Sequence, residues 1–317
     1  MAPEFHELPL NTGDPPYSAW GLWGAGDKLG SLNYLTDEVV LKTIKEEVIT
    51  GERVGLDLPL DLFQPPLLGR VGFTQKIIDK DPFVVNDDVI TFNTQCSSQW
   101  DSMRHFAYQK EKQFYNGITQ QEIHESPHTE VNSLQPWTLR GIAGRGVLVD
   151  FASWAKRNGK TYNTFSQFAI TLEEVKSTVE EEKLVFQPGD ILFLRTGYVE
   201  AYRSATTEQK QDIASIKEWI GLGQGKETTE WLWEHQFAAV AADNPGFECR
   251  PAADDVQAWH LHPILLAGWG TPIGELFDLD RLAELCEKRQ KWSFFLTSAP
   301  LNYTGAVASP PNAIAIL

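Results

Sequence analysis

The chain has 317 residues, of which 42% are hydrophobic and 22% charged, a composition typical of a globular protein with a large core. Its 43 acidic side chains outnumber the 27 basic ones, giving a formal net charge of -16. Phosphate backbones and anionic lipid would repel such a surface, so we expect neither a nucleic-acid partner nor a membrane.

The first predicted element is a helix that begins after Thr36 and ends at Gly51. Thr36 is a suitable N-cap, and acidic residues follow it in the first turn. Val40, Ile44 and Val48 recur at helical spacing. The pattern predicts that these three side chains form the apolar face of the helix.

Two further helices are predicted by capping boxes, in which an N-cap hydroxyl and a side chain three residues later satisfy each other's backbone N–H groups. The pairs are Thr171 with Glu174 and Thr206 with Gln209. We expect both helices to lie on the surface.

Short apolar runs bounded by turn residues predict buried strands. They lie at residues 146–151, 190–199, 237–243 and 291–300. The Asp- and Pro-rich segment 56–88 predicts loops or edge strands. Because composition does not change along the chain, we expect one α/β domain over residues 1–317, with a mixed central β-sheet flanked by helices.

The stretch NTQCSSQWDSMRHFAY, residues 93–108, gathers polar side chains where an apolar strand should end. Gln95, Gln99 and Asp101 have the even spacing of one face of an extended segment, and His105 follows four residues after Asp101. The cluster is a candidate site. The alternative is a strand end and turn whose polar groups cap nearby backbone.

A second candidate stretch is WHLHPILLAGWGTPIGE, which contains His262 and, thirteen residues later, Glu275. A helix would deliver the imidazole and the following loop the carboxylate. The alternative is a core helix in which His262 is satisfied by local hydrogen bonds.

Several other chemistries and locations are excluded by inspection. The chain has no G-x-S-x-G nucleophile elbow, no H-E-x-x-H zinc motif and no complete nucleotide-binding glycine motif. Cys96, Cys249 and Cys286 form no C-x-x-C pair, which indicates reduced thiols. The N-terminal stretch lacks the features of a signal peptide, and no apolar run is long enough to span a bilayer. We expect a cytoplasmic protein.

The two polar stretches together resemble the cyclase superfamily, which contains bacterial kynurenine formamidase and isatin hydrolase. The family signature H-x-G-T-H-x-D-x-P-x-H falls on Gln95, Gln99, Asp101 and His105, with glutamine in place of the first two histidines. WGLWGAGDKLGSLNYLT, GDILFLRTGY, AADNPGFE and LLAGWGTPIGE are also similar to the branch with many fungal members. The resemblance implies a single domain with a swivelling β/β/α or β-barrel-like core.

The resemblance also implies roles for these residues. A divalent metal ion (Zn, Mn or Mg) is expected at Gln95, Gln99 and Asp101, with His262 and Glu275 close by. A glutamine offers a neutral amide oxygen, so zinc should lose more affinity than Mn²⁺ or Mg²⁺. His105 is the expected proton-transfer group, acting with Asp101.

The implied function is a metal-dependent hydrolase that opens a cyclic or aryl amide, imide or lactone with an activated water. Two alternatives are a ring-closing or dehydrating cyclase of secondary metabolism and a non-catalytic small-molecule-binding relative. We expect a small-molecule substrate and a homo-oligomer, a dimer or larger. The aromatic side chains expected to wall the substrate pocket are Trp20, Trp23, Trp100 and Tyr115.

Overall fold

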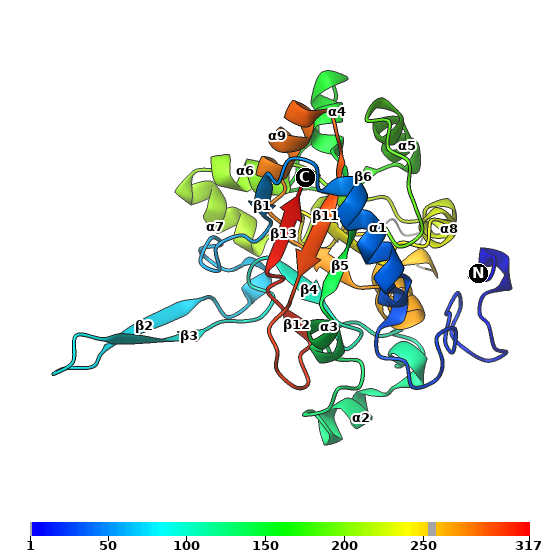
Figure 1. Cartoon of the computed structure of the whole chain (residues 1–317), viewed down its shortest axis with the longest axis horizontal. Coiled ribbons are helices and arrows are strands. Elements are labelled where there is room, and N and C mark those ends of the chain that lie inside the picture. The colour runs from blue at the N-terminus through cyan, green and yellow to red at the C-terminus, as the bar shows by residue number, and fades with distance from the viewer. Residues whose placement is uncertain (1, 253–257) are drawn as a thin grey trace.

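The computed structural model describes residues 2–252 and 258–317, and its centre is a mixed β-sheet flanked by helices (Figure 1). Within these residues the sheet has nine strands in the order β1-β13-β11-β5-β7-β9-β10-β4-β12. Their bounds are β1 Arg53–Gly55, β4 Gln99–Asp101, β5 Ile142–Val149, β7 Ile191–Leu194, β9 Ala239–Ala242, β10 Ile273–Glu275, β11 Ser293–Ser298, β12 Ala308–Ser309 and β13 Ala313–Ile316. The predicted α/β class with a mixed central sheet is confirmed.

The middle of the sheet is parallel and its two sides are antiparallel. Strands β5, β7, β9 and β10 pair in parallel, whereas β1, β13 and β11 on one side and β4 and β12 on the other pair antiparallel. The parallel strands β5, β7 and β9 are buried at nearly every position, as expected when helices cover both faces. All four predicted strands therefore exist, and their continuous apolar runs explain why they could be recognised.

The helices connect and cover these strands. Their bounds are α1 Asp37–Glu47, α2 Gln120–Glu125, α3 Gln135–Arg140, α4 Phe151–Arg157, α5 Leu172–Glu181, α6 Tyr198–Ser204, α7 Thr207–Ser215, α8 Lys226–Glu234 and α9 Asp280–Arg289. Thr36 caps α1 as predicted, and both predicted capping boxes are formed at α5 and α7. None of the helices in the described ranges is both long and apolar enough to cross a membrane.

Helix α1 lies over strands β5 and β11, but its packing face is not the one that the sequence predicts (Figure 1). Thr43 and Glu47 are buried, whereas the side chains of Ile44 and Val48 are exposed. Glu47 faces inward because it accepts hydrogen bonds from Arg145 and from the neighbouring Lys291. The polar pairing therefore outweighs the apolar periodicity that the prediction used.

Two small sheets complete the fold. Strands β6 (Phe168–Ile170) and β8 (Ile220–Leu222) pair in parallel. Strands β2 (Thr74–Asp79) and β3 (Asn86–Thr91) form a hairpin that projects far from the body of the molecule (Figure 1). This hairpin occupies part of the segment that the sequence assigned to loops or edge strands.

Candidate active site

The candidate site begins on the adjacent strands β4 and β10. Gln99 stands directly opposite Glu275 in their antiparallel register, and the amide nitrogen of Gln99 donates a hydrogen bond to Glu275 Oε2. Gln99 and Asp101 share one face of β4 because side chains alternate along a strand. Glu275 therefore lies on a strand, not on the loop that the sequence predicted.

The first polar stretch converges on Asp101. Gln95 Nε2 donates to Asp101 Oδ1 at 2.8 Å and lies 3.3 Å from His105 Nδ1. His105 Nε2 lies 3.7 Å from Asp101 Oδ2. Gln95 is in a turn before β4, so the extended geometry predicted for this stretch holds only for Gln99 and Asp101.

His262 joins this group from the start of the π-helical segment Pro263–Trp269. Its Nδ1 lies 2.6 Å from Glu248 Oε1, and its Nε2 lies 3.3 Å from Glu275 Oε1. The ring centroids of His262 and His105 are 6.0 Å apart. The two stretches that the sequence singled out therefore meet in one cluster.

Burial and neighbouring charges shift the pKa values of this cluster. Burial, and then the negative charge of Glu275, raises the pKa of Asp101 well above its usual range. Burial, and then the charge of His262, lowers the pKa of His105 to about 4, so its imidazole is neutral at neutral pH. Burial alone would lower the pKa of His262, but the carboxylates of Glu248 and Glu275 outweigh it and raise that pKa to about 10.

The donor set fits a divalent cation. Asp101, His105 and His262 each offer one ligand atom, and these atoms lie within 4.8 Å of one another. Asp101 Oδ2 and Gln99 Oε1 are buried and have no hydrogen-bond partner among the described residues. A buried oxygen without a partner is costly, and a cation would satisfy both atoms. The cluster therefore supports the expected metal ion without specifying its identity.

Comparisons with known proteins place this fold. A family model described as "Putative cyclase" matches residues 33–249, more than half of the chain. A solved structure described as a novel cyclase is 30% identical, with a TM-score of 0.82 over 95% of this chain and 99% of that one. The chain belongs to the cyclase family. No curated protein matches it.

More distant solved structures share the fold of this cyclase-family protein. An isatin hydrolase A from Labrenzia aggregata, bound to benzyl benzoate, is 16% identical, with a TM-score of 0.59 over 83% of this chain and 93% of that one. Isatin hydrolase A from Ralstonia solanacearum is 14% identical, with a TM-score of 0.60 over 83% and 91%. At these identities the likeness concerns the fold alone.

The four predicted substrate-binding aromatic residues lie in the core or beside it. Trp100 is fully buried on the face of β4 opposite to Asp101 and donates to Ser298 Oγ at 3.0 Å. The other three are anchored near the N-terminal segment. Trp20 donates to the Ala267 carbonyl at 2.6 Å, Trp23 packs edge-on against Tyr34, and the Tyr115 hydroxyl lies 3.2 Å from Asp27 Oδ2. Their role in substrate binding stays a prediction.

The structure adds three residues that the site prediction lacked. Glu248 holds Nδ1 of His262, and Phe106 packs against both imidazoles, with ring centroids 5.5 Å from His262 and 6.2 Å from His105. Arg70 Nη1 donates to the Gln95 carbonyl at 2.6 Å. Glu248 ends the AADNPGFE stretch that supported the family resemblance, and Phe106 follows His105 directly. These two positions in the sequence were the signals that could have identified Glu248 and Phe106.

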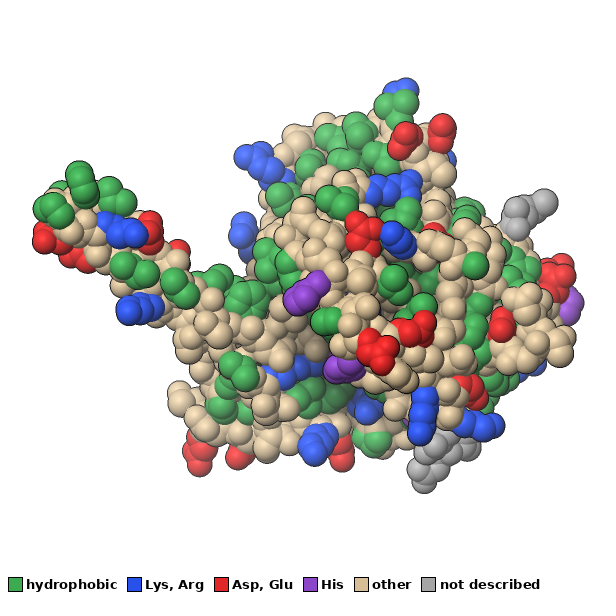
Figure 2. All heavy atoms as spheres, turned by 90° about the horizontal axis from the view of Figure 1, so that it is seen from below, with side chains coloured by type: hydrophobic (Ala, Val, Ile, Leu, Met, Phe, Trp, Pro, Cys, Tyr) green, Lys and Arg blue, Asp and Glu red, His purple; other side chains and the backbone are tan. Residues whose placement is uncertain are grey.

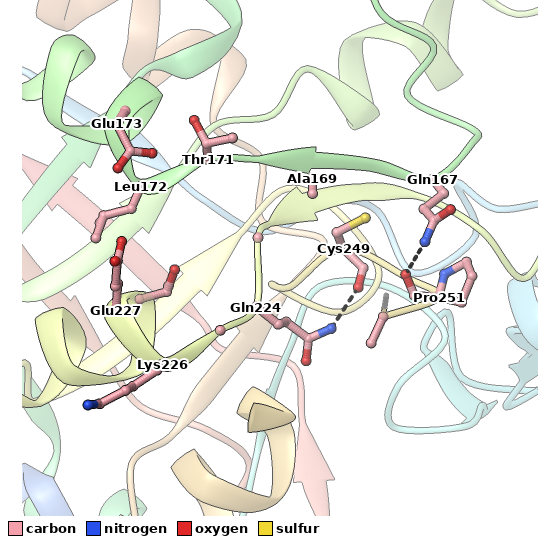
Figure 3. A pocket seen from close by; sticks show the side chains of 14 residues that line it. Gln167, Ala169, Thr171, Leu172, Glu173, Gln224, Lys226, Glu227, Cys249 and Pro251 are labelled. Atoms are coloured by element: carbon pink, nitrogen blue, oxygen red, sulfur yellow. Dashed lines mark hydrogen bonds between the residues drawn. The ribbon is translucent and has the colours of Figure 1, made fainter. Parts of the chain in front are cut away.

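A cavity of about 590 Å³ lies away from this cluster (Figure 3). Strand β6, the segment that follows β8 and the first turns of α5 and α8 line it. Gln224 donates to the Cys249 carbonyl, and Gln167 donates to the Pro251 carbonyl. Its described lining contains no histidine and none of the predicted site residues. We therefore place the candidate active site at the Asp101–His105–His262 cluster, where acid, base and metal-ligand atoms converge.

Proposed function

We propose that this protein is a metal-dependent hydrolase that opens a cyclic or aryl amide, imide or lactone. The observation that carries the proposal is the neutral imidazole of His105 beside the buried, partly unpaired carboxylate of Asp101. A purely structural cluster has no need of an unpaired buried oxygen next to a titratable base.

Asp101, the free amide oxygen of Gln99 and His262 would hold the metal ion, with His262 giving up the proton that its contacts with Glu248 and Glu275 favour in the metal-free protein. Glu275 fixes the amide of Gln99. A divalent cation in this position supplies a Lewis acid for the substrate carbonyl and lowers the pKa of water. Glu248 orients His262 through Nδ1, leaving Nε2 directed toward the cluster.

His105 moves the proton in this scheme. Its imidazole accepts a proton from the attacking water and delivers it to the leaving nitrogen or oxygen. Hydrolysis then yields a carboxylic acid together with an amine from an amide, an amide from an imide, or an alcohol from a lactone. Gln95 positions His105 and Asp101 relative to one another. Phe106 covers both imidazoles with an apolar surface, which favours a substrate with an aromatic or cyclic body.

The test combines metal analysis with a small substrate panel. Protein purified without chelator is analysed for bound metal, and thermal shift is measured with Zn²⁺, Mn²⁺ and Mg²⁺. Hydrolysis is then assayed on N-formyl aryl amines, isatin-like lactams and aryl lactones. We expect a bound divalent ion and metal-dependent turnover of at least one class. Absence of both metal binding and turnover would contradict the proposal and favour the small-molecule-binding alternative.

A further inference from the structure

The candidate site is buried on one side and open on the other. Gln99, Asp101 and Glu275 are buried. Gln95 and His105 are only half-buried, and 21% of the His105 side chain is exposed. A substrate therefore reaches the cluster past Gln95 and His105, and the residues around this opening are in a position to select it.

Arg70 lies at this opening. Its Nη1 donates a hydrogen bond to the Gln95 carbonyl at 2.6 Å, and the side-chain amide of the same glutamine contacts Asp101 and His105. One residue therefore separates the guanidinium from the two groups that carry the proposed chemistry. Arg70 is half-buried, and the β2–β3 hairpin that follows it projects away from the body, so the surface at the root of the hairpin stays uncovered (Figure 2).

The guanidinium of Arg70 has unused donors. Among the described residues, Nη1 has an acceptor but Nε and Nη2 have none, and no described carboxylate forms an ion pair with Arg70. By contrast, Arg145, Arg195 and Arg203 each pair with at least two carboxylates. Nε and Nη2 lie on one edge of the planar guanidinium, and this edge matches the two oxygens of a carboxylate.

The backbone around Arg70 holds it in place. Its N–H donates to the Leu67 carbonyl at 3.2 Å, and the carbonyl of the next residue, Val71, accepts from Asn93 N at 3.1 Å. Asn93 Oδ1 in turn accepts from Gln95 N at 2.9 Å. These bonds tie together the two chain segments at the base of the hairpin. The guanidinium is therefore positioned beside the opening before a ligand binds, which reduces the entropic cost of binding.

The charge of Arg70 acts on the site. Burial and the charge of Glu275 raise the pKa of Asp101, and the charges of His262 and Arg70 oppose this rise. Burial and the charge of His262 lower the pKa of His105, and the charge of Arg70 lowers it further. The carboxylates of the cluster and the net charge of -16 would repel an anionic substrate. A positive charge at the opening offsets this repulsion.

We propose that Arg70 determines substrate specificity by binding a carboxylate of the substrate, so that the protein prefers anionic substrates to neutral ones. The inference rests on the proposed hydrolase function, which places the scissile carbonyl at Asp101 and His105. The acidic group of the substrate then reaches Nε and Nη2 of Arg70 across Gln95. Lactams, lactones and aryl amides without an acidic group are accordingly poorer substrates than their carboxylated counterparts.

The first experiment compares substrates that differ only in the acid. Formanilide is the neutral compound, and the ortho, meta and para isomers of formamidobenzoate are the anionic ones. We expect the wild type to have a higher kcat/KM for at least one anionic isomer than for formanilide. Arg70→Gln should lower this preference at least about tenfold, mainly through KM, because a charge-assisted hydrogen bond is lost. Arg70→Lys should keep part of the preference, because its ammonium group still attracts the carboxylate.

The matched control is Arg53→Gln. Arg53 is exposed on β1, which lies at one edge of the sheet, whereas β4 lies near the other edge. This change removes the same charge and should leave the preference for the acid unchanged. A loss specific to Arg70→Gln therefore reports a local contact and not the net charge. Melting curves check that each variant folds.

Binding is measured separately from turnover. Calorimetry on His105→Asn protein with Mn²⁺ gives the dissociation constants of the same compounds, and adding Arg70→Gln should weaken the preferred anionic isomer at least about tenfold. A wild type that hydrolyses none of the compounds would count against the hydrolase function, while calorimetry would still decide whether Arg70 binds the acid.

Three results overturn the inference about Arg70. The first is that no anionic isomer is preferred to formanilide in turnover or in binding. The second is that Arg70→Gln leaves the preference unchanged, which would place the acid elsewhere, for example on the metal ion. The third is an equal loss for anionic and neutral compounds, which would show that Arg70 only supports the segment that carries Gln95.

Discussion

Two of the buried groups of charged side chains in the described part of the chain are satisfied to different degrees. Around Arg195, each guanidinium nitrogen has a carboxylate partner: Nη1 lies 3.0 Å from Asp150, Nε lies 3.1 Å from Asp280, and Nη2 lies 2.5 Å from Glu200. In the candidate site, three carboxylates face two imidazoles, and Asp101 Oδ2 and Glu248 Oε2 have no hydrogen-bond partner among the described residues.

We interpret this difference as the one between a structural cluster and a functional one. A paired buried charge network fixes the packing of the elements that carry it, here β7, α4, α6 and α9. A buried cluster with excess negative charge lowers stability unless a cation joins it. Glu182 and Asp190 also have an unpartnered oxygen, but among the described residues only Asp101 combines one with two other potential metal ligands.

Removal of the proposed proton carrier should give the largest effect. We expect His105→Ala and His105→Asn to lower turnover by about two to four orders of magnitude, the usual range for loss of a general base. Because the proposed function assigns the metal ion to Asp101, Gln99 and His262, metal content and melting temperature should stay close to those of the wild type. The matched control is His124→Asn, because His124 is exposed on α2. Full activity in a folded His105→Ala protein would remove the catalytic assignment.

Substitution in the Arg195 cluster should lower stability and leave turnover unchanged, the opposite of the result expected for His105. Arg195→Met leaves the carboxylates of Asp150 and Asp280 buried without their partner, and we expect a loss of about 3–5 kcal/mol in the free energy of unfolding. Turnover per folded molecule should be retained, because the hydrogen-bond partners of Arg195 do not belong to the site. Urea unfolding and activity of the folded fraction measure the two effects.

In the candidate site, the substitution that corresponds to Arg195→Met is Asp101→Asn. Because the pKa of Asp101 is raised in the folded protein, its ionised form lowers stability as pH rises above the unfolded value. The metal-free asparagine variant should therefore be at least as stable as the metal-free wild type at about pH 8, while turnover falls. A destabilisation as large as that of Arg195→Met would show that Asp101 is structural.

The sequence predicts those parts of the fold in which local pattern and tertiary packing agree. The strands at the centre are continuous apolar runs, and the helix caps need only side chains three residues apart. Helix α1 fails this condition, because the inward direction of Glu47 is decided by Arg145 and Lys291, which are distant in sequence. The hairpin segment was assigned only to loops or edge strands, because it has no buried face and hence no alternation that would define its two strands.

In the site, the sequence identified residues but not their contacts. Gln95, Gln99, Asp101, His105, His262 and Glu275 were all named, and the structure brings them together. Glu248 was not named, because its function depends on a 2.6 Å contact with His262 that no spacing reveals. Spacing also does not reveal burial, which lowers the pKa of His105 from its ordinary value of 6.5 to about 4.

Replacing the two glutamines of the candidate site with histidine should increase its affinity for zinc. We expect the double change Gln95→His with Gln99→His to strengthen Zn²⁺ binding at least about tenfold, because imidazole is a better zinc ligand than an amide oxygen. Mg²⁺, which prefers oxygen, should gain nothing. Titration calorimetry measures both affinities, with the exposed Gln109→His as the control. Unchanged zinc affinity would mean that these side chains do not face the metal.

The acid limb of the pH–rate profile is the smallest expected effect and the one that depends most on burial. Only the neutral imidazole of His105 can accept a proton, so the rate should stay level as pH falls from about 7 and should halve near pH 4, the pKa that burial imposes. The residual rate of His105→Asn should lack this limb, and melting curves at each pH exclude acid unfolding. An acid limb with its midpoint near pH 6.5, the ordinary pKa of histidine, would contradict this prediction. It would show that water reaches the imidazole of His105 in the working protein.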